Sequence, residues 1–247
     1  MLLHLQTWAA VEDYLKRSRG IIVPIGSTEQ HGPNGLIGTD AICAEIIAKG
    51  VGESESALVA PTIAVGMAQH HLAFPGSMTL RPSTLIAVVR DMVASLARHG
   101  LTRFYFINGH GGNIATVTAA FSEIYAERSM ERLSNQPSIK CALRNWWDGP
   151  GIKKLSQELY PVGEGSHATA SEVALPWYKY PETMNRTQLE PRIAPNGSFA
   201  DAEDYRRAFP DGRIGSDPSQ ATPEHGMRFY ETAVEEVARD YEKWVAR

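Results

Sequence analysis

The chain has 247 residues, of which 43% are hydrophobic and 21% are charged, and its formal net charge is −4. One α/β domain over residues 1–247 can bury a sizeable core at this length, and the composition excludes a disordered or fibrous chain. The acidic balance, without a cluster of Lys and Arg, argues against binding to nucleic acid.

The cysteines and the N-terminal region indicate a reducing compartment. Cys43 and Cys141 do not suggest a disulfide framework, and we expect both to be buried thiols. The N-terminal region has no basic stretch and soon reaches Glu12 and Asp13. No uninterrupted apolar run approaches the ~18 residues of a membrane span. We therefore expect a cytoplasmic protein without membrane contact.

Hydrophobic periodicity predicts alternating helices and strands. Thr7 is placed to cap one helix, and Pro82 stands in the first turn of another. In chain order we predict helix 7–16, strand 21–25, helix 40–51, strand 57–65 (broken by Pro61), helix 82–99, strand 104–107, helix 114–133 and strand 138–143. This βαβ pattern predicts an α/β fold with a mainly parallel sheet.

The alternation weakens after Trp146. The stretch 181–223 is rich in Pro, Gly, Asp and Arg and lacks clear periodicity, and it is too long for a simple connector. We interpret it as a subunit-contact or lid segment. A long amphipathic helix is predicted over 223–246.

A group of candidate metal ligands follows the predicted strand 21–25. Glu29 and His31 are two residues apart, so in an extended segment they point to the same side. Glycine-rich turns after His31 can bring Asp40, at the start of a helix, back to the same point. Nitrogen and oxygen ligands without a thiolate indicate a catalytic Zn, Mn or Fe site. On these residues alone, an ordinary loop with Asp40 as a helix cap is an equal alternative.

A second histidine motif, Asn108–Asn113, follows the predicted strand 104–107 and places His110 between glycines. Ligands bind at the carboxyl ends of strands in open parallel sheets, so we expect the two loops to meet. The glycine pattern also resembles a phosphate cradle at a helix start. Ile114 occupies the position of a third glycine and no Walker lysine is present, so we favour the metal interpretation.

Taken together, these motifs resemble the creatininase (creatinine amidohydrolase) family. The matching stretches are Gly-Ser-Thr-Glu-Gln-His-Gly-Pro at 26–33, Gly-Thr-Asp at 38–40, His-Leu-Ala-Phe-Pro-Gly-Ser at 71–77, Asn-Gly-His-Gly-Gly-Asn at 108–113, and His-Ala at 167–168 followed by Glu172. The resemblance implies a three-layer α/β/α fold, a site for two divalent transition-metal ions and hydrolysis of an amide-type carbon-nitrogen bond in a small molecule. It also implies a homo-oligomer, with a hexamer as one candidate state.

The resemblance also implies the ligand set. Asp40 would bridge the ions, since a carboxylate has two oxygens that both ions can share. Glu29 and His31 would each hold a different ion, His110 would join one of them, and Glu172 would complete the other.

The roles of the remaining candidates depend on the same resemblance. His167 and Glu172 are five residues apart, roughly 140° around a helix, so His167 must lie in or before the first turn if both serve the site. In a glycine-rich loop His167 is expected to keep an ordinary pKa and to donate a proton to the leaving nitrogen. The residues expected to contact substrate are His71, Ser77, Gly111 and Trp147, with His71 alternatively orienting a metal ligand.

One departure concerns the substrate. The branch of the family that acts on creatinine carries an acidic residue two positions after the histidine, where this chain has Gly112. Creatinine is therefore one candidate beside other cyclic amides, formamides and small peptides. The hypothesis from a different class is a non-catalytic α/β protein that binds a nucleotide or metabolite at its glycine-rich strand ends.

Overall fold

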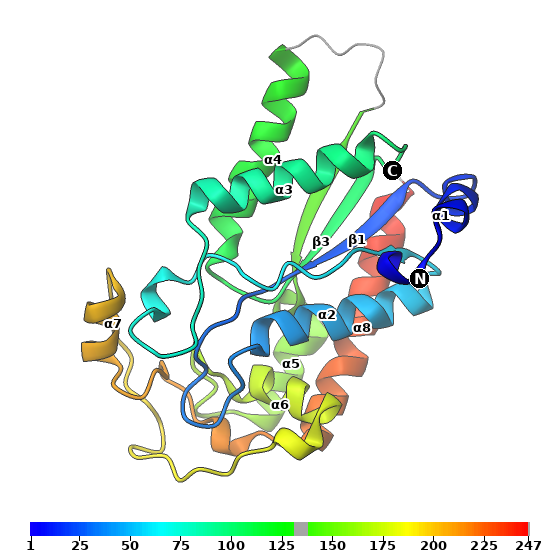
Figure 1. The fold of residues 1–247 in the computed structure, drawn as a ribbon. Helices are drawn as coiled ribbons and strands as arrows, with labels where there is room; N and C mark the ends of the chain where they lie inside the picture. Colours follow the sequence, from blue (N-terminus) through cyan, green and yellow to red (C-terminus); the bar gives the residue numbers. More distant parts are fainter. Residues whose placement is uncertain (131–137, 247) are drawn as a thin grey trace.

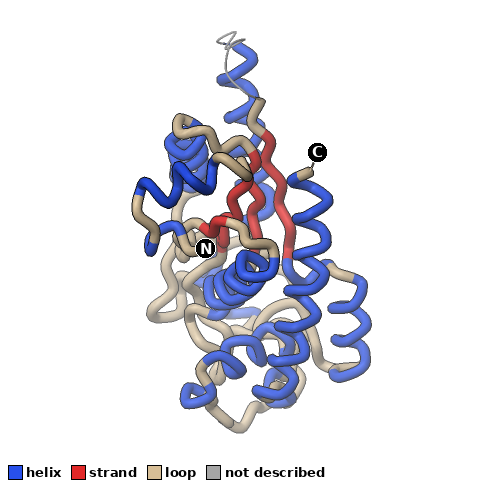
Figure 2. The backbone as a smooth tube through the Cα atoms, turned by 90° about the vertical axis from the view of Figure 1, so that its right-hand side faces the viewer, coloured by secondary structure: helices blue, strands red, loops and turns tan. Residues whose placement is uncertain are grey.

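A parallel sheet between two layers of helices organises the chain (Figures 1 and 2). The computed structural model describes residues 1–130 and 138–246. Across the sheet the strand order is β2-β1-β3-β4, all parallel, and the bounds are β1 Gly20–Ile25, β2 Leu58–Val59, β3 Arg103–Asn108 and β4 Lys140–Asn145. The predicted α/β/α fold with a mainly parallel sheet is confirmed.

The helices on the two faces come from different parts of the chain. Their bounds are α1 Trp8–Leu15, α2 Thr39–Ser54, α3 Pro82–Ala97, α4 Asn113–Met130, α5 Pro150–Leu159, α6 Ala170–Lys179, α7 Ala202–Ala208 and α8 Pro223–Val245, with 3-10 turns η1 Leu3–Leu5, η2 Gln69–His71, η3 Trp146–Asp148, η4 Pro181–Thr183 and η5 Pro218–Gln220. In Figure 1, α3 and α4 lie on one side of β1 and β3, while α2 and α8 lie on the other.

Alternate side chains of the central strands fill two hydrophobic cores. Ile22 and Tyr105 pack into the core with α2, α5, α6 and α8. Their neighbours Ile21 and Phe104 pack into the core with α1, α3 and α4. The period of two is that of an extended strand, and burial on both faces explains the continuous apolar runs of β1 and β3.

Most predicted elements agree with the structure, including the Thr7 cap, which accepts a hydrogen bond from the Ala10 N–H. The predicted strand 57–65 is wrong in its length. Pairing stops after Val59, and a single bridge to β1 resumes at Ile63. Pro61 has no N–H to donate to the ladder, which explains the interruption. Helix α4 ends the described stretch at Met130, so residues 131–133 of the predicted helix lie outside the described residues.

The sequence predicted no periodic structure for segment 181–223. In the structure, polar contacts hold this segment in place. The Arg213 side chain is fully buried and donates to the carbonyls of Pro191, Arg192 and Ser216 and to the Asp211 carboxylate. A buried guanidinium whose N–H donors are all satisfied can hold an irregular segment together without a strand ladder. The segment contains α7 and lies against the loop that follows β1.

Two smaller expectations also have an outcome. Cys43 is buried as expected, whereas Cys141 is half-buried, and both are free thiols. Within residues 1–130 and 138–246, none of the helices combines the length and apolarity that a membrane crossing needs.

The register of the sheet brings three loops to one edge. Ile25 at the end of β1 is paired with Asn108 of β3, which is paired with Asn145 of β4. The segments that follow these residues carry Glu29, His110 and Trp147 respectively. As expected for a parallel sheet, the candidate site lies at the carboxyl ends of the strands.

Candidate metal centre

The loop after β1 buries a carboxylate and an imidazole. Glu29 and His31 are 0% and 1% exposed. They do not extend the strand, which ends at Ile25. The loop is shaped by backbone contacts, with the Glu29 N–H donating to the Ile37 carbonyl at 2.8 Å and the Gly35 N–H donating to the His31 carbonyl at 3.1 Å. A tight turn, and not strand alternation, brings the two side chains to the site.

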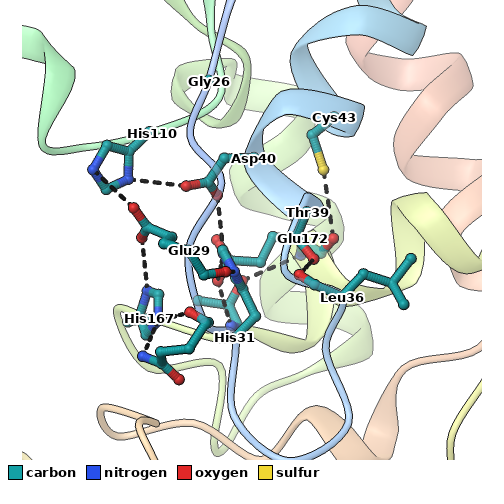
Figure 3. A network of polar contacts seen from close by, with 12 residues as sticks. Gly26, Glu29, His31, Leu36, Thr39, Asp40, Cys43, His110, His167 and Glu172 are labelled. Atoms are coloured by element: carbon teal, nitrogen blue, oxygen red, sulfur yellow. Dashed lines mark hydrogen bonds and ion pairs between the residues drawn. The ribbon is translucent and has the colours of Figure 1, made fainter. Parts of the chain in front are cut away.

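Asp40 lies between two imidazoles and does not cap its helix. Gly38 is the N-cap residue of α2, so the capping alternative is excluded. Asp40 Oδ1 lies 3.0 Å from His31 Nε2, and Oδ2 lies 2.9 Å from His110 Nδ1. Figure 3 shows the carboxylate with one oxygen toward each ring. Each oxygen can therefore serve a different ion.

Two asparagines hold the loop of His110 against its neighbours. Asn108 Oδ1 accepts from the His110 N–H at 3.1 Å, and Asn113 Nδ2 donates to the Gly26 carbonyl at 3.0 Å. Asn113 Oδ1 in turn accepts from the Met67 N–H at 3.0 Å. The motif thus connects three loops at the carboxyl edge of the sheet.

The same turn is poorly suited to cradle a phosphate. A cradle needs free N–H groups at the helix start. Here the Asn113 N–H donates to the His110 carbonyl, and the Ile114 N–H donates to the Gly111 carbonyl, both at 3.2 Å. This geometry favours the metal interpretation of the motif.

Glu172 has two roles. It is the third residue of α6, and its Oε1 accepts from the Thr169 N–H at 2.8 Å in a capping box. The same oxygen lies 3.8 Å from His31 Nε2. His167 precedes the helix, as the five-residue spacing required. Burial raises the pKa of Glu172 to about 7, so a nearby cation would favour the ionised carboxylate at neutral pH.

The polar atoms form groups of the size that a metal ion needs. Ligand atoms lie within 4.8 Å of one another in Glu29–Asp40–His110, in His31–Asp40–Glu172 and in Glu29–His31–His167. The first two groups share Asp40. Both Glu29 oxygens and Asp40 Oδ2 are buried without a hydrogen bond of good geometry. Buried carboxylate oxygens without donors fit a cation, and the nitrogen and oxygen donors suit Zn, Mn or Fe.

The titration of these groups reflects the same need for positive charge. Burial opposes protonation of His31 and His110, yet the neighbouring carboxylates raise their pKa values to about 10 and about 9. Burial likewise opposes ionisation of Asp40, but the two imidazoles lower its pKa below the ordinary value. The buried carboxylates thus need protons on the imidazoles or cations in their place.

Each of these two imidazoles has one nitrogen fixed by a backbone carbonyl. His31 Nδ1 lies 3.0 Å from the Glu29 carbonyl, and His110 Nε2 lies 3.1 Å from the Met67 carbonyl. A neutral ring that donates from these atoms presents its other nitrogen to Asp40. Such contacts orient histidine ligands in metal sites.

The expected ordinary pKa of His167 is wrong. Burial, together with the neighbouring His31 and His71, holds the pKa of His167 well below its usual value. The loop is also fixed, since Ser216 Oγ donates to the His167 carbonyl at 2.7 Å. His167 Nε2 lies 2.9 Å from both the carbonyl oxygen and the side-chain Nε2 of Gln30, and its Nδ1 lies 3.9 Å from Glu29 Oε1.

Gln30 is a residue that the motif analysis passed over. Its Nε2 donates to the Gly212 carbonyl and to His71 Nδ1, both at 2.9 Å. This contact favours the His71 tautomer protonated on Nε2, which lies 3.0 Å from Glu29 Oε1 as an ion-pair contact. His71 therefore orients the Glu29 carboxylate. The only sequence signal for Gln30 was its position between Glu29 and His31.

Of the other residues expected to contact substrate, some line a cavity and one does not. Gly111 and Trp147 line a cavity of about 720 Å³ that also reaches Asp40 and Glu172. Ser77 is not in its lining, and its Oγ accepts from the Gln30 N–H at 3.1 Å. The Ser77 hydroxyl therefore holds the loop of Gln30, and a contact with substrate stays a prediction.

Gly112 leaves no space for a side chain. A Cβ there would lie 2.4 Å from His110 Nε2 and 2.6 Å from the Met67 carbonyl oxygen. An acidic residue at this position requires the His110 ring or the loop of Met67 to move. Gly112 thus permits the close contact between His110 Nε2 and the Met67 carbonyl that orients the His110 ring.

The fold and the site define an α/β protein with a candidate metal centre at the carboxyl edge of its sheet. Comparisons with known proteins agree. The family described as Creatininase, creatinine amidohydrolase, matches residues 4–241. The chain therefore belongs to the creatininase family, whose members are amidohydrolases.

Individual relatives are distant in sequence. Creatinine amidohydrolase of Pseudomonas putida is 28% identical over 67% of this chain and 66% of its own length. Mycofactocin precursor peptide peptidase of Mycolicibacterium smegmatis is 27% identical over 91% of this chain and 85% of its own. A solved structure described as creatininase Mn is 25% identical, with a TM-score of 0.84 over 100% of this chain and 99% of that chain.

The contact between Gln30 and His71 generates a prediction. Gln30→Leu should weaken metal binding about 10–100-fold, because His71 loses the donor that fixes its tautomer and Glu29 loses its orientation. Competition with a chromophoric chelator measures the affinity. Gln69→Leu, at an exposed position on the adjacent η2, is the matched control and should bind as the unmodified protein does. Equal affinities in both variants would contradict the role of Gln30.

Proposed function

We propose that this protein is a metal-dependent amidohydrolase with a dinuclear centre, in which Asp40 would serve both of two divalent ions of Zn, Mn or Fe. Glu29 and His110 would hold one ion, and His31 and Glu172 would hold the other. The observation that supports this assignment is the Asp40 carboxylate, whose two oxygens face two different groups of nitrogen and oxygen donors. The solved relatives described as Mn and Zn-Zn creatininases are consistent with it.

The bound ions would supply an activated water near neutral pH and polarise the amide carbonyl. The protein residues supply orientation and proton transfer. The backbone carbonyls of Glu29 and Met67 hold the rings of His31 and His110, and His71 holds the Glu29 carboxylate. His167, which burial keeps neutral, would accept the proton released during attack and deliver it to the leaving nitrogen.

The substrate is a small-molecule amide larger than creatinine. A cavity of about 720 Å³ is within the range of sites for drug-sized ligands. Gly112 removes the acidic residue found in the creatinine branch, and the relatives named for creatinine and for a precursor peptide differ greatly in substrate size. A linear amide, a formamide or a short peptide therefore suits the site better than creatinine.

The alternative of a non-catalytic metabolite-binding protein loses its main support, because the N–H groups of Asn113 and Ile114 are already hydrogen-bonded. Metal content separates the two functions, since only the hydrolase requires close to two transition ions per chain. The homo-oligomeric state, with a hexamer as one candidate, stays a prediction.

Asp40→Ala should lose both ions and all hydrolysis, because a bridging carboxylate serves both groups of ligands. His31→Ala and His110→Ala should each lose mainly one ion. Elemental analysis of protein purified without chelators gives the stoichiometry. Asp91→Ala, on the exposed side of α3, is the control. Full occupancy in Asp40→Ala would refute the bridge.

Removal of the metals should abolish activity and lower thermal stability, because Glu29, Asp40 and Glu172 then share a buried site without their cations. Mn, Zn or Fe(II) should restore both properties, since several ions suit mixed carboxylate and imidazole sites. Calorimetric unfolding and turnover on the same samples measure this. Restoration by Mg alone would contradict the ligand assignment.

His167→Ala should keep both ions and lose roughly 10²–10⁴-fold in kcat, the range of general acid–base residues. Metal content and kcat are measured on one preparation, with His99→Ala as the control outside the cavity. Unchanged turnover would remove His167 from proton transfer. Loss of an ion would make it a ligand, which its place near Glu29 and His31 also allows.

A further inference from the structure

The wall of the cavity formed by α5 carries one unpaired positive charge. Lys153 is the only Lys or Arg among the residues found to line the cavity, within the described parts of the chain. Its ammonium group makes no hydrogen bond or ion pair with any described residue. The other ionisable groups of the lining are carboxylates, histidines and the Tyr205 phenol.

The packing of α5 fixes where Lys153 points. Ile152 and Leu155 are buried in the core with α8, and the Gly151 N–H donates to Glu236 Oε1 at 2.7 Å. With 100° between successive residues, Lys153 falls on the face shared by Ser156 and Gln157. Both of these residues line the same cavity.

The neighbouring lysine lies on a different face. Lys154 is a further 100° around the helix, outside the cavity lining and near Glu158. Glu158 pairs with Arg228 of α8, with 2.8 Å between Oε1 and Nη2. Lys153 and Lys154 therefore have similar exposure but different surroundings, and only Lys153 can contact a bound molecule.

Glu164, a carboxylate of the lining, forms no ion pair with Lys153 in the described parts of the chain. Glu164 accepts hydrogen bonds from the Ser171 hydroxyl and from the Ser171 N–H. These contacts use the carboxylate to hold the start of α6. The positive charge of Lys153 is thus available to a ligand.

We propose that Lys153 determines substrate specificity by binding a carboxylate that the amide substrate carries at a distance from the scissile bond. This inference rests on the proposed function of the same site. A single ammonium group matches the single charge of one carboxylate. The half-buried Trp147 on the same wall can cover the apolar part of such a substrate.

The test compares pairs of probes on the metal-loaded enzyme. N-formyl amino acids and dipeptides are used as free acids and as their C-terminal carboxamides. The unmodified enzyme should prefer the acids about tenfold in kcat/KM, as expected for a charge-assisted hydrogen bond. In Lys153→Met the preference should fall to about twofold through KM of the acids, while kcat for the carboxamides is unchanged.

Controls distinguish this role from a structural one. Lys154→Met should keep the full preference, Lys153→Arg should keep most of it, and added salt should reduce it because Lys153 reaches solvent. Equal preference in Lys153→Met and Lys154→Met, or no preference in the unmodified enzyme, would overturn the proposal.

A failure of the proposed hydrolysis can be distinguished from a failure of the proposed carboxylate site. If no probe is hydrolysed, calorimetric titration of the same acids into the metal-loaded protein still decides the question. Binding at least fivefold weaker to Lys153→Met than to Lys154→Met would support the carboxylate site, and equal binding would refute it.

Discussion

The site depends on burying several carboxylates at one point. Glu29 and Asp40 are almost inaccessible to solvent, and Glu172 lies close to the same His31 ring. Such a group is unfavourable unless positive charge accompanies it. The raised pKa values of His31 and His110 show how the isolated protein can meet this requirement. Divalent ions would supply the positive charge without protonation of the ligands. Metal binding and the local stability of the site therefore depend on the same buried carboxylates.

The fold provides this concentration of charge through close backbone approach. The Gly109 N–H donates to the Ile25 carbonyl at 2.8 Å, and a Cβ at Gly109 would lie 2.0 Å from the Asp40 carbonyl oxygen. The loop of His110 can thus lie directly against the start of α2. Gly109 and Gly112 of the motif permit close packing between loops, and Asn113 supplies the hydrogen bonds that glycine cannot.

Local patterns predicted the features that depend on neighbours in sequence. The alternation of helices and strands gave the parallel sheet, and its strand ends gave the loops of Asp40 and His110. The roles of Gln30 and Ser77 were not predictable in this way. Gln30 reaches His71 and Gly212, which are 41 and 182 positions away, and no periodicity records such contacts. The use of Ser77 to hold the Gln30 N–H is equally non-local.

The structure of segment 181–223 was not predictable for the same reason, since it too depends on non-local contacts. Arg213 organises it through carbonyl groups, and a carbonyl is present at every residue whatever the side chain. A sequence therefore reveals the donor but not its acceptors. The pKa of His167 was misjudged for a related reason. Glycines nearby suggested a solvated loop, whereas Gln30 contacts the ring and Ser216 holds the backbone carbonyl of His167.

The replacement of an acidic residue by Gly112 has an electrostatic consequence that joins the centre to the cavity. In the proposed dinuclear centre with neutral imidazoles, the carboxylates of Glu29, Asp40 and Glu172 would leave one positive charge on two divalent ions. An acidic side chain at position 112 would cancel it. The glycine would therefore keep the proposed centre cationic, which would strengthen its attraction for an oxyanion that develops during amide hydrolysis. The proposed metal end of the cavity would then have the same sign of charge as Lys153, so that an anionic substrate would be attracted to the cavity from both ends, and its orientation would depend on which group fits each end.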